Sequence, residues 1–180
     1  MHLQLDEIAS PMGPILLVTD EDGALRALDF GDNEARLRRM LRDHYGDCEL
    51  PRGAAPASVI EALEAYFEGQ LDALDEVRVA TGGTPFQREV WKALRTIEAG
   101  GTRSYGQLAA TVGRPTASRA VGAANGSNPV SIVVPCHRVI GANGSLTGYG
   151  GGMARKKWLL DHERQFAPSR SGVQRTLVAV

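Results

Sequence analysis

The feature that most constrains the fold is a change in the residue pattern close to residue 80. Before this point, alternating or continuous apolar stretches of strand length dominate, whereas after it glycine and proline divide the chain into short helical segments. Residues 77–84, which end in Thr-Gly-Gly-Thr, mark the boundary. We therefore expect an α+β fold with an N-terminal domain over residues 1–80, a C-terminal domain over residues 84–165, and a flexible tail over residues 166–180.

The N-terminal domain is expected to be a small antiparallel sheet with helices. The stretches LQLDEIAS, GPILLVTD and ALRALDF predict three strands, and Glu21-Asp22-Gly23 predicts a hairpin turn. Two helices should follow, over residues 33–46 and 57–70, with Asn33 as the N-cap of the first. The first of these helices has one apolar face, formed by Leu37, Met40 and Leu41.

The C-terminal domain is predicted to be mostly helical, with sharply marked helix ends. Capping boxes at 84–87 and 104–107 each place a Thr or Ser three residues before a Gln, and so predict two helix starts. The second of these helices should end at Gly113, and a third should run from Pro115 to residues 125–126. Two short helices joined through a Gly-Arg-Pro turn are typical of a helix-turn-helix motif.

The third C-terminal helix has two contrasting faces. Its inward face is predicted to hold Ala117, Ala120, Val121 and Ala124. Its outward face then holds Arg119, Gly122, Ala123 and Gly126. Small residues permit close approach of a large partner, into which Arg119 would project. A surface arginine on a helix packed tightly against a neighbour fits the pattern equally well.

Charge is distributed very unevenly along the chain. Residues 1–84 carry 7 Lys and Arg against 17 Asp and Glu, a net charge of −10. Residues 85–165 carry 11 against 4, a net charge of +7, and the tail adds two arginines. Runs of charge usually form solvated surfaces. A difference of this size between the two halves nevertheless favours a polyanionic partner for the second half. Because the same half contains the helix pair, we expect this partner to be nucleic acid.

The segment around Cys136 combines a nucleophile with polar neighbours. The apolar run 130–134 predicts a buried strand that leads directly into Pro-Cys-His-Arg. A lone cysteine in such a place is usually a small buried hydrophobe. His137 and Arg138, however, would each favour a thiolate. Because neighbouring residues on a strand point to opposite faces, contact with His137 requires a bend at Pro135 or a bridging water.

Cysteine content and apolar patterning exclude several classes of protein. Two cysteines can neither form a disulfide framework nor supply a four-cysteine zinc site. Cys48 lies among acidic residues, which disfavour its thiolate, and with His44 it offers too few ligands for zinc. We interpret Cys48 as structural and predict no metal. The N-terminus predicts a strand and not a signal peptide, and no apolar run is long enough to span a membrane, so we expect an intracellular, reducing compartment.

The segments SYGQLAATVGRPTASRAVGAANGSNP and PCHRVIGANGSLTGYGGG together resemble the O6-alkylguanine-DNA alkyltransferase (methylated-DNA–protein-cysteine methyltransferase) family. The resemblance runs from about Thr84 to Glu163, and TGGTPFQREVW at its start is similar to the bacterial members. The N-terminal 80 residues are similar only in the order of strands and helices. The resemblance implies a ribonuclease-H-like N-terminal domain and a C-terminal domain with a helix-turn-helix and a short sheet.

The same resemblance implies roles for five residues of a catalytic site. Cys136 would accept the alkyl group, His137 would act as a base through a water molecule, and Glu163 would orient His137. Asn128 would brace the turn and bond near the thiol, and Tyr105 would donate a hydrogen bond to the leaving guanine. A carboxylate at the C-terminal end of a helix opposes the helix dipole, which makes a specific partner for Glu163 more plausible.

Further residues are implied in binding. Arg119 would enter the duplex and fill the gap left by a flipped nucleotide. The implied DNA-binding set is Ser104, Thr116, Ala117, Ser118, Arg119, Gly122 and Ala123. Val139, Tyr149 and Gly150 would line the base pocket, although Tyr149 could instead simply pack. His162 is expected to face solvent.

The function implied by the resemblance is direct-reversal DNA repair. The protein would bind double-stranded DNA, flip out O6-alkylguanine and transfer the alkyl group irreversibly to its own cysteine, without a cofactor; O4-alkylthymine stays open as a second lesion. A cytoplasmic monomer that can cluster on DNA is expected. A helix-turn-helix DNA-binding or damage-recognition module stays open as an alternative, although it leaves Cys136 without purpose. A Cys-His acyl hydrolase stays open as well, although it does not explain the helix-turn-helix.

Overall fold

The computed structural model describes residues 1–168, and its N-terminal part is a three-stranded antiparallel sheet. The strands are β1 (Leu3–Ile8), β2 (Ile15–Asp20) and β3 (Leu25–Phe30), in that order, which confirms the three predicted strands. The predicted hairpin turn joins β2 to β3. Gly23 adopts a φ of +75° there, a conformation in which residues with a Cβ atom are strained.

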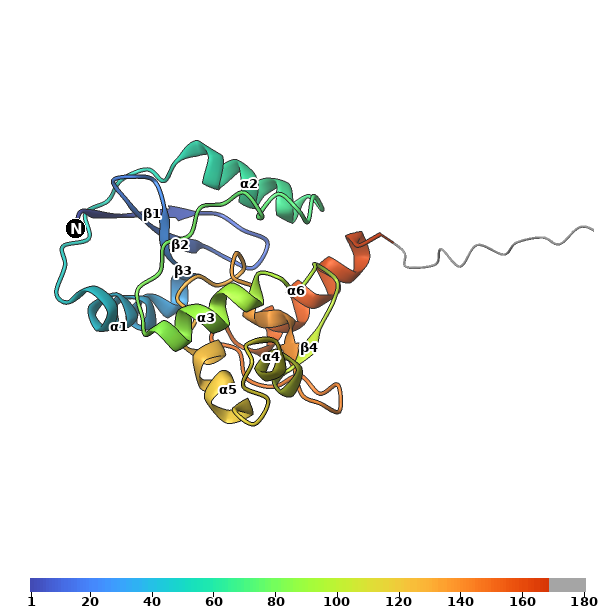
Figure 1. The fold of residues 1–180 in the computed structure, drawn as a ribbon. Coiled ribbons are helices and arrows are strands. Elements are labelled where there is room, and N and C mark those ends of the chain that lie inside the picture. The colour runs from blue at the N-terminus through green and yellow to red at the C-terminus, as the bar shows by residue number, and fades with distance from the viewer. Residues whose placement is uncertain (169–180) are drawn as a thin grey trace, which may run out of the picture.

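The two faces of this sheet are covered by different helices (Figure 1). After a short 3-10 turn, η1 (Gly31–Asn33), helix α1 (Glu34–Tyr45) packs on one face, which consists of Leu3, Leu5, Leu16, Val18 and Ala27. Helix α2 (Ala57–Phe67) and the C-terminal half cover the other face, which consists of Ile15, Leu17, Leu25, Leu28 and Phe30. Side chains alternate along a strand, so β2 is buried on both faces.

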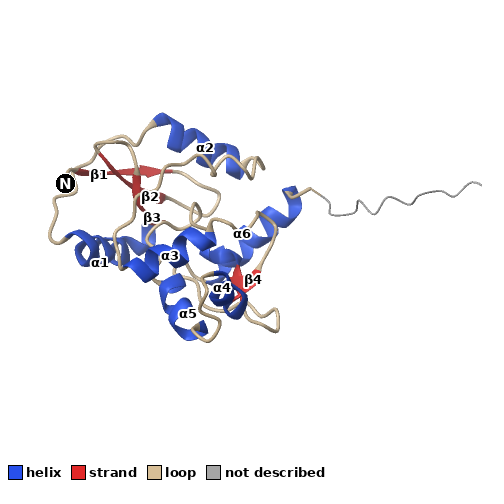
Figure 2. Ribbon diagram, viewed as in Figure 1, coloured by secondary structure: helices blue, strands red, loops and turns tan. Residues whose placement is uncertain are grey.

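The C-terminal half consists of short helices and a two-stranded parallel sheet (Figure 2). Its elements are α3 (Pro85–Leu94), β4 (Arg103–Ser104), α4 (Tyr105–Thr111), α5 (Ser118–Gly126), the 3-10 turn η2 (Cys136–Arg138), β5 (Val139–Ile140) and α6 (Met153–Phe166). Both predicted capping boxes are confirmed, with Thr84 capping α3 and Ser104 capping α4. Pairing of β4 with β5 ties the helix pair α4–α5 to the segment that follows η2.

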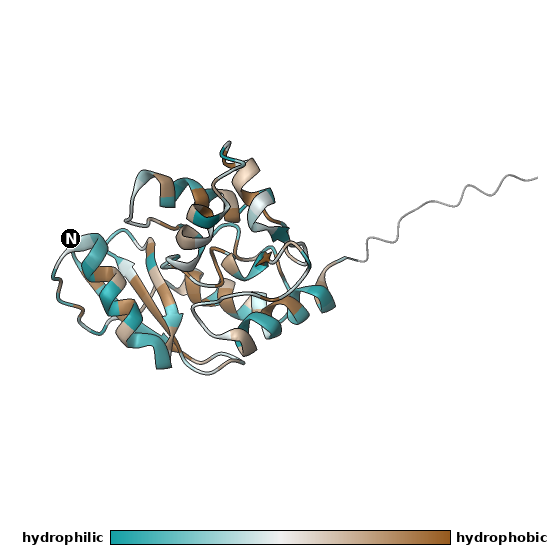
Figure 3. Cartoon of the chain, turned by 90° about the horizontal axis from the view of Figure 1, so that it is seen from below, coloured by the Kyte–Doolittle hydropathy of each residue, from teal (hydrophilic) through white to brown (hydrophobic). Residues whose placement is uncertain are grey.

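One cluster of buried apolar residues runs through both halves and confirms the predicted α+β class. It extends from Leu28 and Tyr66 in the first half to Trp91, Val121 and Leu159 in the second. Apolar residues follow the strands and the inner faces of the helices, while hydrophilic residues lie on outer faces (Figure 3). Within residues 1–168, no helix is long and apolar enough to cross a membrane.

Helix α5 differs from the prediction at its start and along its inner face. It begins at Ser118 and not at Pro115, because residues 114–117 form a turn closed by a backbone hydrogen bond. The residues predicted to face inward divide into two buried residues, Val121 and Ala124, a half-buried Ala117 and an exposed Ala120. The buried stripe is therefore narrower than predicted, since α5 lies at the molecular surface.

The segment 130–134 is buried, but it is not the predicted strand. Only Val130 pairs with β3, through a single parallel bridge, and the next three residues turn with Ile132 at a φ of +70°. The side chain of Asn128 accepts a hydrogen bond from the Val130 N–H and donates to the Val134 carbonyl. These side-chain bonds replace the ladder bonds of a strand.

Two expectations about the C-terminal helix are wrong, namely where the tail begins and whether His162 faces solvent. Phe166 belongs to α6 and its ring contacts that of His162, with 5.0 Å between centroids, so the predicted tail begins later than residue 166. Residues 169–180 of the predicted tail lie outside the described residues. His162 is buried and does not face solvent, because α2 covers it: its Nε2 lies 2.8 Å from the Tyr66 carbonyl oxygen, and its ring stacks on Trp158.

Candidate active site

Cys136 is the first residue of η2 and is almost completely buried, with 5% of its surface exposed. Asn128, in the loop after α5, donates from Nδ2 to the Cys136 sulfur over 3.1 Å. The same amide donates to the Val134 carbonyl over 2.8 Å, which fixes its orientation. Pro135 bends the chain into η2, which is one of the two alternatives that the sequence left open. The sulfur therefore lies in a fixed position against a hydrogen-bond donor.

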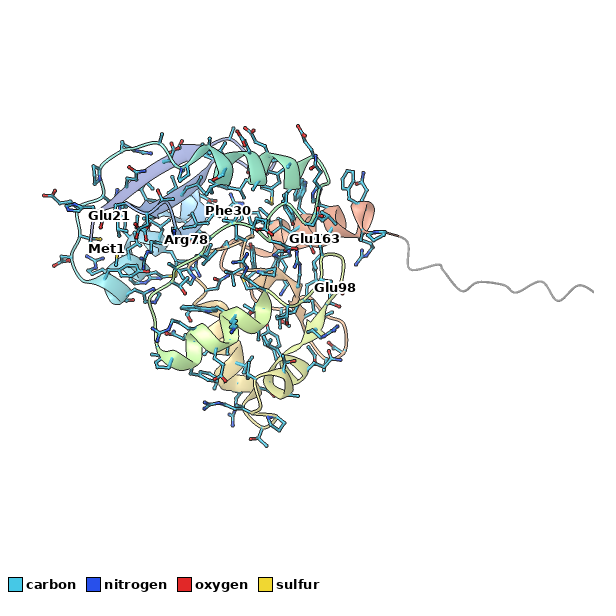
Figure 4. The ribbon with its side chains drawn as sticks, turned by 45° about the horizontal axis from the view of Figure 1, so that its top comes forward. Met1, Glu21, Phe30, Arg78, Glu98 and Glu163 are labelled. Atoms are coloured by element: carbon cyan, nitrogen blue, oxygen red, sulfur yellow. The ribbon has the colours of Figure 1, made fainter. Side chains whose placement is uncertain are left out.

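Glu163 on α6 is held as a buried anion by several donors. Burial opposes its ionisation, but hydrogen bonds from His137 and Arg138, together with the charge of Arg138, more than offset this and hold the pKa of Glu163 well below its usual range. The Arg138 guanidinium donates to it over 2.9–3.1 Å. The Tyr66 hydroxyl and the Gly100 N–H donate over 2.9 and 3.1 Å. Glu163 lies within the molecule where α6 approaches the N-terminal half (Figure 4).

His137 is the residue that links this anion to the segment of the thiol. Its Nε2 lies 2.7 Å from Glu163 Oε1, and because a carboxylate can only accept, Nε2 carries the proton. Burial lowers the pKa of His137, with only partial compensation from Glu163, so the ring is neutral. Its Nδ1 is then an acceptor, buried and without a hydrogen-bond partner among the described residues. The site therefore contains one basic nitrogen, His137 Nδ1, that is available to accept a proton.

The thiol of Cys136 is protonated at rest. Burial raises its pKa, and the Asn128 donor and the charges of Arg36 and Lys156 offset this only in part. The sequence had assigned a stabilising charge to Arg138. Its guanidinium instead faces the carboxylate on α6, so the positive charges that favour the thiolate come from α1 and α6.

A cavity of about 200 Å³ opens at Cys136 between α4, α5 and the loop before α6. Of the predicted pocket residues, Tyr149 and Gly150 line it. Val139 does not, because its side chain is fully buried in the core. Tyr105 also lines the cavity, and its hydroxyl lies 3.1 Å from Thr147 Oγ1. The cavity is thus lined by Cys136, two tyrosines, Arg36 and several small residues.

The predicted DNA-binding residues lie along the start of α4 and along α5. Arg119, Thr116 and Ala123 are exposed, whereas Ser104, Ala117, Ser118 and Gly122 are half-buried. Gly122 lines the cavity, so this surface is continuous with the site of Cys136. A Cβ atom added at Gly126 would meet nothing within 4 Å, so packing within the protein does not require glycine there.

Sequence reasoning missed Arg36, which connects the N-terminal sheet to the site. Its guanidinium pairs with the fully buried Asp29 and donates to the carbonyls of Gly126 and Asn128 over 3.0 and 3.2 Å. Helix α1 carries four arginines, so nothing in the sequence distinguishes this one.

Lys156 was missed as well, although a signal was present. Its fully buried ammonium group donates to the carbonyls of Val139 and Thr147, both over 2.6 Å. Lys156 shares the buried face of α6 with Leu159 and Glu163, and charged residues on an apolar helix face indicate specific partners. Residues 1–168 contain no group of three or more His, Cys, Asp or Glu side chains suited to a metal ion.

Comparison with known proteins identifies one family over most of the described chain. The family model for the ribonuclease-like domain of 6-O-methylguanine DNA methyltransferase matches residues 7–81, and the model for its DNA binding domain matches residues 85–165. A methylated-DNA--protein-cysteine methyltransferase of Salmonella typhimurium is 53% identical over 165 residues, which cover 91% of this chain and 96% of that protein. One of Mycobacterium tuberculosis is 47% identical and covers 90% and 93%.

Solved structures show the same fold. The crystal structure of the Mycobacterium tuberculosis O6-methylguanine methyltransferase aligns with a TM-score of 0.75 at 41% identity, over 93% of this chain and 96% of that one. The crystal structure of Mycobacterium tuberculosis OGT in complex with DNA aligns with a TM-score of 0.76 at 41% identity, over 94% and 96%. The chain therefore belongs to the 6-O-methylguanine DNA methyltransferase family.

Proposed function

We propose that this protein repairs DNA by taking the alkyl group of O6-alkylguanine onto Cys136 and keeping it there as a thioether. The observation that carries the proposal is a buried cysteine sulfur in the wall of a small cavity, next in the chain to a neutral histidine with an unused basic nitrogen. Relatives named methylated-DNA--protein-cysteine methyltransferase, at 53% and 47% identity, support it.

The reaction starts from the neutral thiol. His137 Nδ1 takes the thiol proton through a water molecule, and Glu163 stabilises the imidazolium at Nε2. The Cys136 sulfur then attacks the alkyl carbon, forming the S–C bond as the bond from that carbon to O6 breaks. Arg36 and Lys156 favour the thiolate by their charge during this step.

The leaving guanine takes the electron pair of the broken bond. Tyr105 exchanges its partner Thr147 for O6 and donates a hydrogen bond to it. The proton carried by His137 passes to the base, so that guanine is restored and the imidazole is neutral again. The thioether product has no electrophilic carbonyl for water to attack. One protein molecule therefore repairs one lesion.

The target base has to leave the duplex, because the sulfur of Cys136, a residue that is only 5% exposed, cannot reach a stacked base. Arg119 enters the duplex and fills the gap. Its side chain is exposed and has no hydrogen bond or ion pair within residues 1–168, so it is available to a partner. The small residues of α5 let the duplex approach closely, with Ser104, Thr116, Ala117, Ser118, Gly122 and Ala123 at the contact.

In this proposal residues 84–165 bind DNA and carry the chemistry, while residues 1–80 form a structural domain. The protein acts as a monomer without a cofactor. The reducing cytoplasm suits it, because an oxidised Cys136 could not accept an alkyl group.

The proposal is tested by intact-mass measurement after incubation with a duplex oligonucleotide that contains O6-methylguanine. We expect one stable methyl group per protein, located on Cys136 by peptide mapping, with restored guanine in the oligonucleotide. Cys136→Ala should gain no mass, and Cys48→Ala serves as the matched control because it removes the other free cysteine and should still gain one methyl group.

Other outcomes separate the remaining classes of function. Tight binding of the damaged duplex without a mass change in the wild-type protein would favour a binding module. Repeated turnover with an unmodified sulfur would favour a hydrolase. Either result would overturn the proposal.

A further inference from the structure

Glu163 receives one of its hydrogen bonds from the N-terminal half of the chain. The Tyr66 hydroxyl on α2 donates to Glu163 Oε1 over 2.9 Å, and the two residues are separated by 97 positions in the sequence. The same oxygen also bonds to His137 Nε2 over 2.7 Å. Tyr66 and His137 therefore share one carboxylate oxygen as their partner, although they come from opposite halves of the chain.

The environment of Tyr66 favours this hydrogen bond. The side chain is fully buried, and its ring contacts those of Phe67 and His162 at centroid distances of 5.5 and 5.2 Å. Burial and the charge of Glu163 raise the pKa of Tyr66 well above its ordinary value, so the phenol stays protonated and can only donate to the carboxylate. Contacts with these two rings restrict the movement of the buried Tyr66 side chain.

We propose that Tyr66 is a positioning residue for the alkyl transfer, which sets the orientation and basicity of His137 by donating a hydrogen bond to Glu163. The inference rests on the proposed function, since it assumes that His137 is the base. It assigns to the N-terminal half a second contribution to the chemistry, besides the charge of Arg36.

The physical basis is competition for one oxygen. A donor that shares Glu163 Oε1 withdraws negative charge from it, and this weakens the attraction of that oxygen for a protonated His137. Tyr66 therefore keeps His137 less basic than Glu163 alone would make it. The working base must be neutral at the pH of the reaction, because a protonated imidazole cannot take the thiol proton.

Other polar and charged groups also face Glu163 and His137. Their effect on the pKa of His137 is the same in all the variants proposed below. Arg138 on η2 donates to both oxygens of Glu163, and the Gly100 N–H donates to Oε2. Lys156 on α6 and Arg138 each lower the pKa of His137 by their charge. The Tyr149 ring lies 6.5 Å from that of His137, and His162 contacts only Tyr66 within this group.

The test compares full-length wild-type protein with Tyr66→Phe in single-turnover transfer from an O6-methylguanine duplex, measured across a range of pH. The substitution removes the hydroxyl and keeps the ring. We expect complete transfer by both, a rate at the pH plateau that falls roughly three- to tenfold because the base is oriented less firmly, and an acid limb displaced to higher pH. The displacement follows because a less compensated Glu163 stabilises protonated His137.

Tyr45→Phe is the matched control. Tyr45 is also a tyrosine of the N-terminal half whose hydroxyl bonds to the backbone, at Gly82 N–H over 2.7 Å and Ala80 carbonyl over 3.3 Å, but it does not contact Glu163. Its pH–rate profile should coincide with that of the wild-type protein. Thermal unfolding of both variants shows whether a change in rate comes from lost stability.

A second variant tests the same inference if Tyr66→Phe folds poorly. Replacement of Tyr66 by a ring-fluorinated tyrosine keeps the hydroxyl and makes it a stronger donor, so the acid limb should move to lower pH, opposite to the phenylalanine variant. Acid limbs that coincide for all variants would overturn the Tyr66 inference alone. Absence of methyl transfer by the wild-type protein would overturn the proposed function instead, so the two failures are distinguishable.

Discussion

Two buried acidic groups in one site are found in opposite protonation states. Cys136 and Glu163 are both removed from water, and burial alone would keep both protonated. Glu163 accepts hydrogen bonds from four different residues, one of them an arginine, whereas the sulfur receives a single bond from an amide. The number and charge of the donors therefore decide that the carboxylate is ionised and the thiol is not.

Stability at acid pH provides a prediction at this scale. The folded-state pKa of Glu163 is depressed, so its ionisation contributes stability that is present above the ordinary carboxyl pKa and is lost as pH falls toward the folded-state pKa. Glu163→Gln leaves Arg138 without its anion and should lose about 3 kcal/mol of unfolding free energy at pH 7. Urea denaturation at several pH values should show this difference shrinking as the pH is lowered. A difference that grows toward acid pH would contradict the assignment.

At the scale of elements, the pair α4–α5 is defined by local signals and by small residues. The capping box at Ser104 starts α4, and residues 114–117 form the turn that leads into α5. The buried face of α5 meets α3, where Trp91 Nε1 donates to the Ala124 carbonyl over 2.8 Å. This leaves the opposite face, with Arg119, free for a partner.

Arg119→Ala tests that face. If Arg119 stabilises the flipped state, its loss should slow methyl transfer from duplex DNA roughly tenfold or more, because unstacking a base costs a few kcal/mol, while transfer from the free alkylated base should change little. Rates on the two substrates, measured in parallel, check this. Arg114→Ala is the control, since it removes an exposed arginine of the same motif that is engaged with Glu89 and the Phe86 ring. An equal loss on duplex and free base would remove the role of Arg119.

At the scale of the whole molecule, the two halves of the chain differ in charge but share one apolar core. The two halves differ in formal charge, −10 over residues 1–84 and +7 over residues 85–165. The apolar core nevertheless runs through both, and Arg36 and Tyr66 reach from the acidic half into the site. The acidic half is thus coupled to the chemistry, while the excess positive charge lies in the half that carries the helix-turn-helix.

Salt dependence of DNA affinity follows from this distribution. Lysines and arginines that neutralise phosphates release counterions, so the logarithm of the binding constant should fall linearly with the logarithm of salt concentration. We expect at least a tenfold loss of affinity between roughly 50 and 200 mM salt, measured by fluorescence anisotropy with an undamaged duplex. An affinity that does not change over this range would show that phosphate contacts contribute little.

The amino-acid sequence by itself determined those features of the protein that depend on local interactions. Alternating apolar residues predicted the three strands, Thr84 and Ser104 predicted helix starts through bonds that span three residues, and the motif around Cys136 identified the family. These inferences succeeded because each partner lies within a few positions along the chain. The exposed Ala120 was predicted wrongly, because its burial depends on which neighbours α5 meets.

Only the tertiary structure decided the electrostatics of the site. The bond from Tyr66 to Glu163 spans 97 positions and that from Arg36 to the Asn128 carbonyl spans 92, and no sequence period indicates such pairs. Arg138 was predicted beside the thiol because it is near in sequence, yet it pairs with Glu163, 25 positions away. The sequence therefore determined which reactive groups are present, and long-range packing decided which of them are charged, because protonation depends on burial and on donors brought from distant parts of the chain.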